Sequence, residues 1–309
     1  MSCSTESKDL SGVIFLDKPI GWTSRRAVNE VIRFFSTTGK KRIKAGHAGT
    51  LDPLATGMLP ILIGEATRFA GYGLNAEKTY QVTMDLGYQT DTLDNEGEVT
   101  ARFPEVVIPE QRIDDVLAAF RGRLKQVPPI FSAIRVDGRR AHEMARKGET
   151  VVMEERDIEI FDLTLMASDA LKLTLLVRCS KGTYIRSLCR DIGAALGMGG
   201  CVIDLRRLST GGWPESMMVT PEVMQEMREA CVLPLSQWLR DLPAISLPEG
   251  KARRFIQGQR IQLETEGQGE VAVFWKDMVL GTGVLQPGMA RMVLHPGRIL
   301  PTAQQQFIK

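Results

Sequence analysis

Along the first 250 positions, apolar residues follow two patterns, one typical of strands and the other of helices. Residues 12–16 form a short apolar run, as in a buried strand, and the turn-forming residues 17–21 end it. Behind Thr23 and Ser24, apolar residues recur at helical spacing, which predicts an amphipathic helix with a hydroxyl N-cap. The two patterns predict further strands over residues 78–87, 158–166, 170–179 and 202–208, and further helices over 65–73, 113–120, 183–197 and 221–235.

The pattern changes near residue 250. Pro243, Pro248 and Gly250 cluster there, which indicates a domain boundary. Beyond it, a helical turn is followed by strand-like runs at 260–263, 270–275, 278–285 and 292–299. These roughly sixty residues have the size and content of a small β-barrel.

The segment GHAGTLDPLATG, residues 46–57, interrupts both patterns. Its glycines and Pro53 predict a shaped loop, and the loop holds Asp52 and His47 beside a basic flank at 40–44. Such an arrangement suits a site for an anionic substrate. An aspartate before a proline is also a common helix start, with Asp52 as N-cap, so local chemistry leaves both interpretations open.

The distribution of charge along the chain says more about a binding partner than the net charge does. The chain has 309 residues, and 39 basic against 37 acidic residues give a net charge of +2, which does not by itself indicate a nucleic-acid-binding protein. Basic residues cluster at 40–44, 121–125, 135–147, 178–190 and 206–207. Together they can form a positive face, although each cluster alone is typical of a solvated surface.

Two function classes are disfavoured by composition. The five cysteines include no CxxC pair and no histidines at ligand spacing, which argues against a zinc site and a disulfide scaffold. We therefore predict no metal. The sequence contains neither an apolar signal segment nor a run long enough to span a membrane, so the expected location is the cytoplasm.

Two further features call for a partner. Residues 135–148 predict a hairpin-like turn and a short basic helix with little apolar face, which we expect to project from the body and touch another molecule. Arg186 lies in the first turn of the helix predicted over 183–197, where a cation is mildly unfavourable. An electrostatic partner or plain solvation both account for Arg186 at this point.

Six motifs in this order resemble the TruB family, the bacterial tRNA pseudouridine-55 synthases, along essentially the whole chain. They are residues 15–19 with 21 and 24, 46–57, 78–80 with 86–87 and 90–92, 127–129 with 132–133, 180–186 and 205–207. The glycine-rich loop with Asp52 is the most specific of them. The resemblance implies an α+β pseudouridine synthase fold, a mixed and largely antiparallel sheet flanked by helices, with a small C-terminal PUA-like β-barrel. It places the catalytic domain at 1–245, an RNA-binding thumb insertion at about 125–152, and the PUA-like domain at 246–309.

The activity implied by the resemblance is isomerisation of uridine 55 in the tRNA T-loop to pseudouridine, without a cofactor. The target base must be flipped out of the folded loop before its glycosidic bond is exchanged. The implied partner is tRNA alone; we expect no membrane and no required protein partner, and a monomer. Grip on the RNA by the thumb and the PUA-like domain also motivates the hypothesis of a tRNA-folding role.

Residue by residue, Asp52 matches the catalytic aspartate of the family, and Arg186 the arginine that pairs with it. Tyr80 would stack on the target base, while Tyr184 and Leu205 would line the uracil pocket.

His47 would occupy the space that the base vacates or stack on a neighbouring base. Lys18, assigned with these residues to the substrate site, would be architectural or face a phosphate.

Two alternatives remain. The first is the guide-RNA-dependent relative that acts on ribosomal RNA, which shares the aspartate loop; the full thumb-like stretch 136–149 speaks against it. The second is an RNA-binding protein that has lost its chemistry, which the intact set of catalytic positions disfavours.

Overall fold

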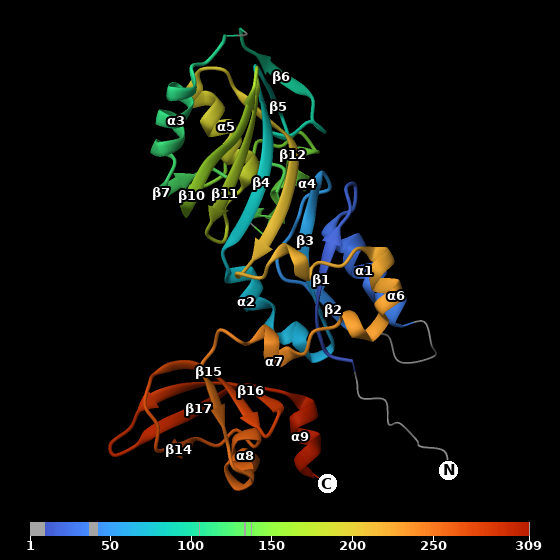
Figure 1. The fold of residues 1–309 in the computed structure, drawn as a ribbon, viewed down its shortest axis with the longest axis vertical. Coiled ribbons are helices and arrows are strands. Elements are labelled where there is room, and N and C mark those ends of the chain that lie inside the picture. Colours follow the sequence, from blue (N-terminus) through green and yellow to red (C-terminus); the bar gives the residue numbers. More distant parts are fainter. Residues whose placement is uncertain (1–9, 37–42, 105, 133, 137, 309) are drawn as a thin grey trace.

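The computed structural model describes residues 10–36, 43–104, 106–132, 134–136 and 138–308, and its strands form two main sheets (Figure 1). The first contains β1 (Gly12–Lys18), β2 (Ala45–His47), β3 (Ala55–Ile63), β4 (Lys78–Leu86), β7 (Gly122–Gln126), β10 (Arg156–Asp169), β11 (Lys172–Cys179) and β12 (Gly200–Thr210). The second contains β13 (Ala244–Ser246), β14 (Ile261–Leu263), β15 (Gly269–Trp275), β16 (Met278–Pro287) and β17 (Met292–Ile299).

Strand order confirms the expected mixed, largely antiparallel sheet. The first sheet runs β1-β3-β12-β4-β11-β10-β7, with β2 added on β3. Its one parallel pair among the described strands is β12 with β3, and its other pairs are antiparallel. The second sheet runs β13-β15-β16-β17-β14 and curls into a half-barrel, as a PUA-like domain does.

Helices cover the sheets and connect them. They are α1 (Ser24–Phe35), α2 (Ala70–Asn75), α3 (Glu110–Ala119), α4 (Ala141–Ala145), α5 (Ile185–Leu196), α6 (Pro221–Met227), α7 (Leu235–Trp238), α8 (Glu249–Ile256) and α9 (Pro301–Ile308), with a 3-10 turn at Gly64–Phe69 before α2. Figure 1 shows α3 and α5 together at one side of the first sheet, and α2 and α7 between the two sheets. None of the helices in the described segments is long and apolar enough to cross a membrane.

The stretch expected to form the thumb, residues 125–152, carries its own small elements. A two-stranded ribbon of β8 (Arg135–Val136) and β9 (Arg139–Arg140) leads into α4, as the sequence predicts for this stretch. A second ribbon, β5 (Tyr88–Thr90) with β6 (Val99–Arg102), lies outside this stretch, where the sequence pattern predicts no strand pair.

Two buried clusters form the core. The larger packs α1, α3 and α5 against the first sheet, for example Val82 and Val177 with Leu188. The other continues from the first sheet into the second, because it joins Phe15 and Phe69 to residues such as Phe255. The two sheets therefore share apolar packing.

Predictions of where helices begin and end were wrong at positions where the backbone dihedral angles, and not the polarity of the side chains, set the boundary. Asp52 is not a helix N-cap, because β3 begins at Ala55, after a turn at residues 53–54. The helix predicted over 221–235 ends at Met227, because Arg228 has a φ of +52° and Pro234 lacks an N–H. Tyr184, not Thr183, is the N-cap of α5, whereas the predicted stop at Gly197 is confirmed by its left-handed φ of +81°.

Candidate active site

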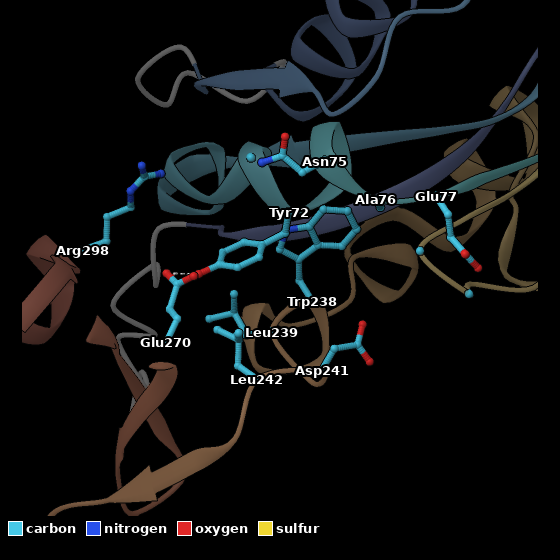
Figure 2. A pocket seen from close by; sticks show the side chains of 13 residues that line it. Tyr72, Asn75, Ala76, Glu77, Trp238, Leu239, Asp241, Leu242, Glu270 and Arg298 are labelled. Carbon is cyan, nitrogen blue, oxygen red and sulfur yellow. Dashed lines mark hydrogen bonds between the residues drawn. The ribbon is translucent and has the colours of Figure 1, made fainter. Parts of the chain in front are cut away.

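Two cavities compete for the role of the site. The larger, about 710 Å³, lies between α2 and the second sheet and is lined by Tyr72, Trp238 and the carboxylates of Glu77, Asp241 and Glu270 (Figure 2). The smaller, about 310 Å³, lies at the end of the loop that carries Asp52. It is lined by five of the predicted site residues: Asp52, Tyr80, Tyr184, Arg186 and Leu205. Because the smaller cavity brings these five residues together, it is the candidate site. The larger cavity is a cleft between the sheets, in which Tyr72 donates to Glu270 at 2.6 Å.

Asp52 and Arg186 form the centre of the smaller cavity. The Nη2 of Arg186 lies 2.8 Å from Oδ2 of Asp52. The Arg186 side chain is 5% exposed, whereas that of Asp52 is 35% exposed, so the carboxylate faces the cavity and the guanidinium backs it. This pairing supplies the electrostatic partner that Arg186 needs at the positive end of α5.

Arg186 has a second carboxylate behind it. Its Nη1 lies 3.3 Å from Oδ2 of Asp94, itself 5% exposed, and donates to the Thr92 carbonyl at 2.7 Å. Nη2 also donates to the Phe131 carbonyl at 3.1 Å. The guanidinium is thereby fixed from several sides, and it in turn fixes Asp52.

Buried polar side chains hold the Asp52 loop in shape. The Ser24 hydroxyl donates to the Leu51 carbonyl and accepts from the Leu51 N–H, both at 2.8 Å. Arg207, 1% exposed, donates to the carbonyls of Gly49 at 3.0 Å and of Met58 at 2.6 Å. Residues 48–54 of the loop are neither helix nor strand, and these bonds take the place of the regular ladder that they lack.

Gly57 is required where the loop joins β3. Parallel pairing sets Gly57 opposite Arg207 of β12, at a φ of +92°. A Cβ at this position would lie 2.3 Å from the Arg207 carbonyl oxygen. Only glycine permits this approach, which brings Leu205 and Arg207 beside the aspartate loop.

Lys78 and Tyr80 enter the cavity from the start of β4. The Lys78 ammonium donates to the carbonyls of Gly73, Leu74 and Ala76 at the end of α2, and burial lowers its pKa to about 8. Burial likewise raises the pKa of the Tyr80 phenol, which bonds to Arg207. Tyr80 is thus a neutral aromatic side chain with its ring in the wall of the cavity.

Lys18 and His47 lie outside the described lining of this cavity. Lys18 is fully buried and donates to the carbonyls of Pro19, Trp22 and Pro53. Burial lowers the pKa of its ammonium to about 8, although the nearby Asp52 charge opposes the shift. Of the two roles expected for Lys18, its position fits the architectural one, because Pro53 directly follows Asp52.

His47 ends β2, next to the aspartate loop. Burial, with the charges of Arg207 and Arg25, lowers the pKa of its imidazole. The ring is therefore neutral at pH 7, which suits stacking on a base.

Sequence reasoning assigned no role in the site to Ser24, Lys78, Asp94 or Arg207. All four stand in or beside motifs that carried the resemblance. Ser24 and Arg207 bond to backbone carbonyls far along the chain, which no local pattern reveals. Lys78 instead bonds to carbonyls two to five residues before it, and Asp94 to the distant Arg186. Within the described residues, no three His, Cys, Asp or Glu side chains gather as a metal site requires.

The chain is similar to known proteins in sequence. A family model described as TruB family pseudouridylate synthase (N terminal domain) matches residues 4–185, and one described as tRNA pseudouridylate synthase B C-terminal domain matches 186–242. The tRNA pseudouridine synthase B of Chromohalobacter salexigens is 42% identical over 262 residues, 84% of each chain. That of Azoarcus sp. (strain BH72) is 39% identical over 96% of this chain and 97% of its own.

The fold also has a solved counterpart. An H/ACA RNP bound to a substrate RNA containing 2′-deoxyuridine aligns with a TM-score of 0.71 at 22% identity, over 94% of this chain and 85% of that one. At this identity the likeness shows the fold alone.

Proposed function

Because the chain belongs to the TruB family of pseudouridylate synthases, and is thus an isomerase that makes pseudouridine in tRNA, we propose that it modifies uridine 55 of the T-loop with Asp52 as catalytic residue. The observation that carries the proposal is the Asp52–Arg186 pair, 2.8 Å apart, in the lining of the 310 Å³ cavity. A cavity of this size is within the range of small-ligand pockets and accommodates one flipped-out base.

The reaction exchanges one glycosidic bond for another. The bond from ribose C1′ to uracil N1 breaks, the base turns, C1′ bonds to C5, the C5 proton leaves, and N1 gains a proton. Asp52 acts on the positive charge that develops at C1′ or as a nucleophile. Arg186 orients the carboxylate and balances its charge while the base turns between Tyr80, Tyr184 and Leu205.

The surfaces outside the cavity bind the rest of the tRNA in this proposal. The thumb, residues 125–152, projects Arg146 and Lys147 into solvent, which supports contact with phosphates of the T-loop. We assign the half-barrel of residues 246–309 to the RNA backbone further along the molecule, and residues 1–245 to catalysis.

The decisive experiment is tritium release from a tRNA transcript labelled at uridine C5, with no other protein or RNA present. We expect release by the wild type, none by Asp52→Asn, and similar tRNA binding by both. Mapping of the product by sequencing should give pseudouridine at position 55 alone within the T-loop. Binding without release by the wild type would overturn the proposal in favour of a guide-dependent or non-catalytic protein.

A further inference from the structure

Gln126 is a buried amide at the root of the thumb. It is the last residue of β7 and is 3% exposed. Its Nε2 donates to the Tyr184 carbonyl at 3.1 Å, and its Oε1 accepts from the Tyr184 N–H at 2.8 Å. A single side chain therefore holds both backbone polar groups of the residue that lines the candidate site.

Tyr184 needs such a partner because of its place in the fold. It is the N-cap of α5, with extended φ and ψ of −99° and 110°. In a capping box, a glutamine within the helix accepts the N–H of the N-cap residue. Here Gln126 does so from a distant strand. It also adds a second donor to the Tyr184 carbonyl, which accepts from the Leu188 N–H at 3.0 Å as the first hydrogen bond of α5.

The segment after Gln126 is tied to the same helix. The Val127 carbonyl accepts from Ser187 Oγ at 2.9 Å and from Arg190 Nη2 at 3.1 Å. The Phe131 carbonyl accepts from Arg186 at 3.1 Å, and Arg186 also holds Asp52. The chain that leads into the thumb thus rests on the first turns of α5, directly behind the cavity.

We propose that Gln126 is a positioning residue for the isomerisation: its amide fixes Tyr184, so that the aromatic wall of the cavity keeps its place as the thumb engages RNA. The proposal rests on the assignment of this cavity to the target uridine. It requires Gln126 to donate as well as accept: the Leu188 N–H also holds the Tyr184 carbonyl, but an acceptor in place of the Nε2 donor would repel that carbonyl.

The test uses Gln126→Glu, whose side chain has the shape of glutamine. A protonated glutamic acid donates its O–H to the Tyr184 carbonyl and accepts from the N–H, as the amide does. An ionised carboxylate has no donor and faces the carbonyl oxygen instead. We expect the single-turnover rate of Gln126→Glu, relative to wild type at the same pH, to be about tenfold reduced at high pH and restored as the pH is lowered. Gln126→Met, which lacks both bonds, should stay reduced at every pH, and tRNA binding by both variants should match wild type.

The single-turnover rate, the Tm and the circular dichroism of each variant together separate the outcomes. A flat rate ratio for Gln126→Glu across pH, or a Gln126→Met that matches the wild-type rate with only a lower Tm, overturns the positioning role. Circular dichroism at each pH shows whether a variant is folded, and a variant that unfolds at high pH is compared through Gln126→Met near neutrality. Loss of turnover by the wild type itself would instead refute the assigned function.

Discussion

Arg186 is the residue at which the charges of the site meet. It lies between two carboxylates and two backbone carbonyls, at 5% exposure. The planar guanidinium serves these acceptors at once, whereas the ammonium of lysine is a single point with a different reach. The interaction is therefore specific to arginine and not merely to a positive charge.

From this we expect Arg186→Lys to lower the single-turnover rate by about a hundredfold, since Asp52 loses its orientation, and to lower Tm because a buried pair is broken. Arg178→Lys is the matched control. Arg178 pairs with Glu77 at 3.1 Å, but both side chains are more than 40% exposed, so its replacement should change rate and Tm little. An Arg186→Lys variant with near wild-type rate would contradict this account.

The lowered pKa of His47 predicts a pH dependence of stability. The folded protein binds the proton less well than the unfolded chain, whose histidine titrates near 6.5. The contribution of neutral His47 is complete above pH 6.5 and is lost as the pH falls through the lower folded pKa. Urea unfolding at pH 7.5 and 5 should therefore show wild type losing stability relative to His47→Gln. An unchanged difference between the two would mean that the imidazole is not desolvated.

The family motifs were enough to predict which side chains line the cavity. The structure brings together Asp52, Tyr80, Tyr184, Arg186 and Leu205. What sequence could not supply is the support beneath them. Ser24 and Arg207 bond to backbone atoms of a loop whose path depends on tertiary pairing, and Lys18 reaches the same loop at Pro53. A buried lysine or arginine therefore has no local pattern that distinguishes it from a surface one.

The thumb is the element whose role is most open to measurement. Arg146 and Lys147 follow α4 and are exposed. Replacing both by alanine should weaken tRNA binding and reduce the slope of log Kd against log salt concentration by about 1.4, because two phosphate contacts to single-stranded RNA are lost. The rate at saturating tRNA should change little.

A charge-matched control separates local contact from long-range attraction. Arg112 on α3 and Lys172 on β11 are also exposed. Their double alanine variant removes the same net charge from other elements. If it weakens binding and reduces the salt slope as much as the thumb variant does, the thumb is not a contact site.

Periodicity was a sound guide to elements that are long and amphipathic, such as α1, where the Thr23 hydroxyl accepts from the Arg26 N–H as expected of a cap. It failed for residues 221–235, where apolar side chains continue at helical spacing past the end of α6. The turn at Arg228 depends on a positive φ that a non-glycine residue adopts only under tertiary constraint. Polarity alone does not encode such a turn.

The whole molecule is held together by contacts between the second sheet and the segment before β4. Glu65 accepts from the Thr302 N–H at 2.9 Å at the start of α9, and Tyr72 donates to Glu270 on β15. The same segment ends at Lys78, which lines the candidate cavity and donates to the end of α2. The sequence pattern therefore changes abruptly near residue 245, although side-chain packing continues across this boundary.

Trp238 is the residue that makes this packing continuous. It lies on α7, which contacts both β1 and β16; its Nε1 donates to the Phe69 carbonyl at 3.0 Å, and its ring centroid is 6.0 Å from that of Phe15. Trp275 is the natural comparison, because its ring packs against Phe307 of α9, with centroids 4.7 Å apart and the planes tilted by 56°, within the C-terminal domain.

We expect Trp238→Ala to cost about 3–5 kcal/mol and to destabilise both sheets together, since the cavity it leaves borders each of them. Native-state hydrogen exchange checks this, because amides of β1 and of β16 should then exchange faster to a similar degree. Trp275→Ala should accelerate exchange chiefly in β15, β16 and β17. If Trp238→Ala instead leaves either β1 or β16 protected as in wild type, the two sheets are independent units that only touch. The orientation of the half-barrel toward the active site would then have to be set by the bound tRNA and not by the protein.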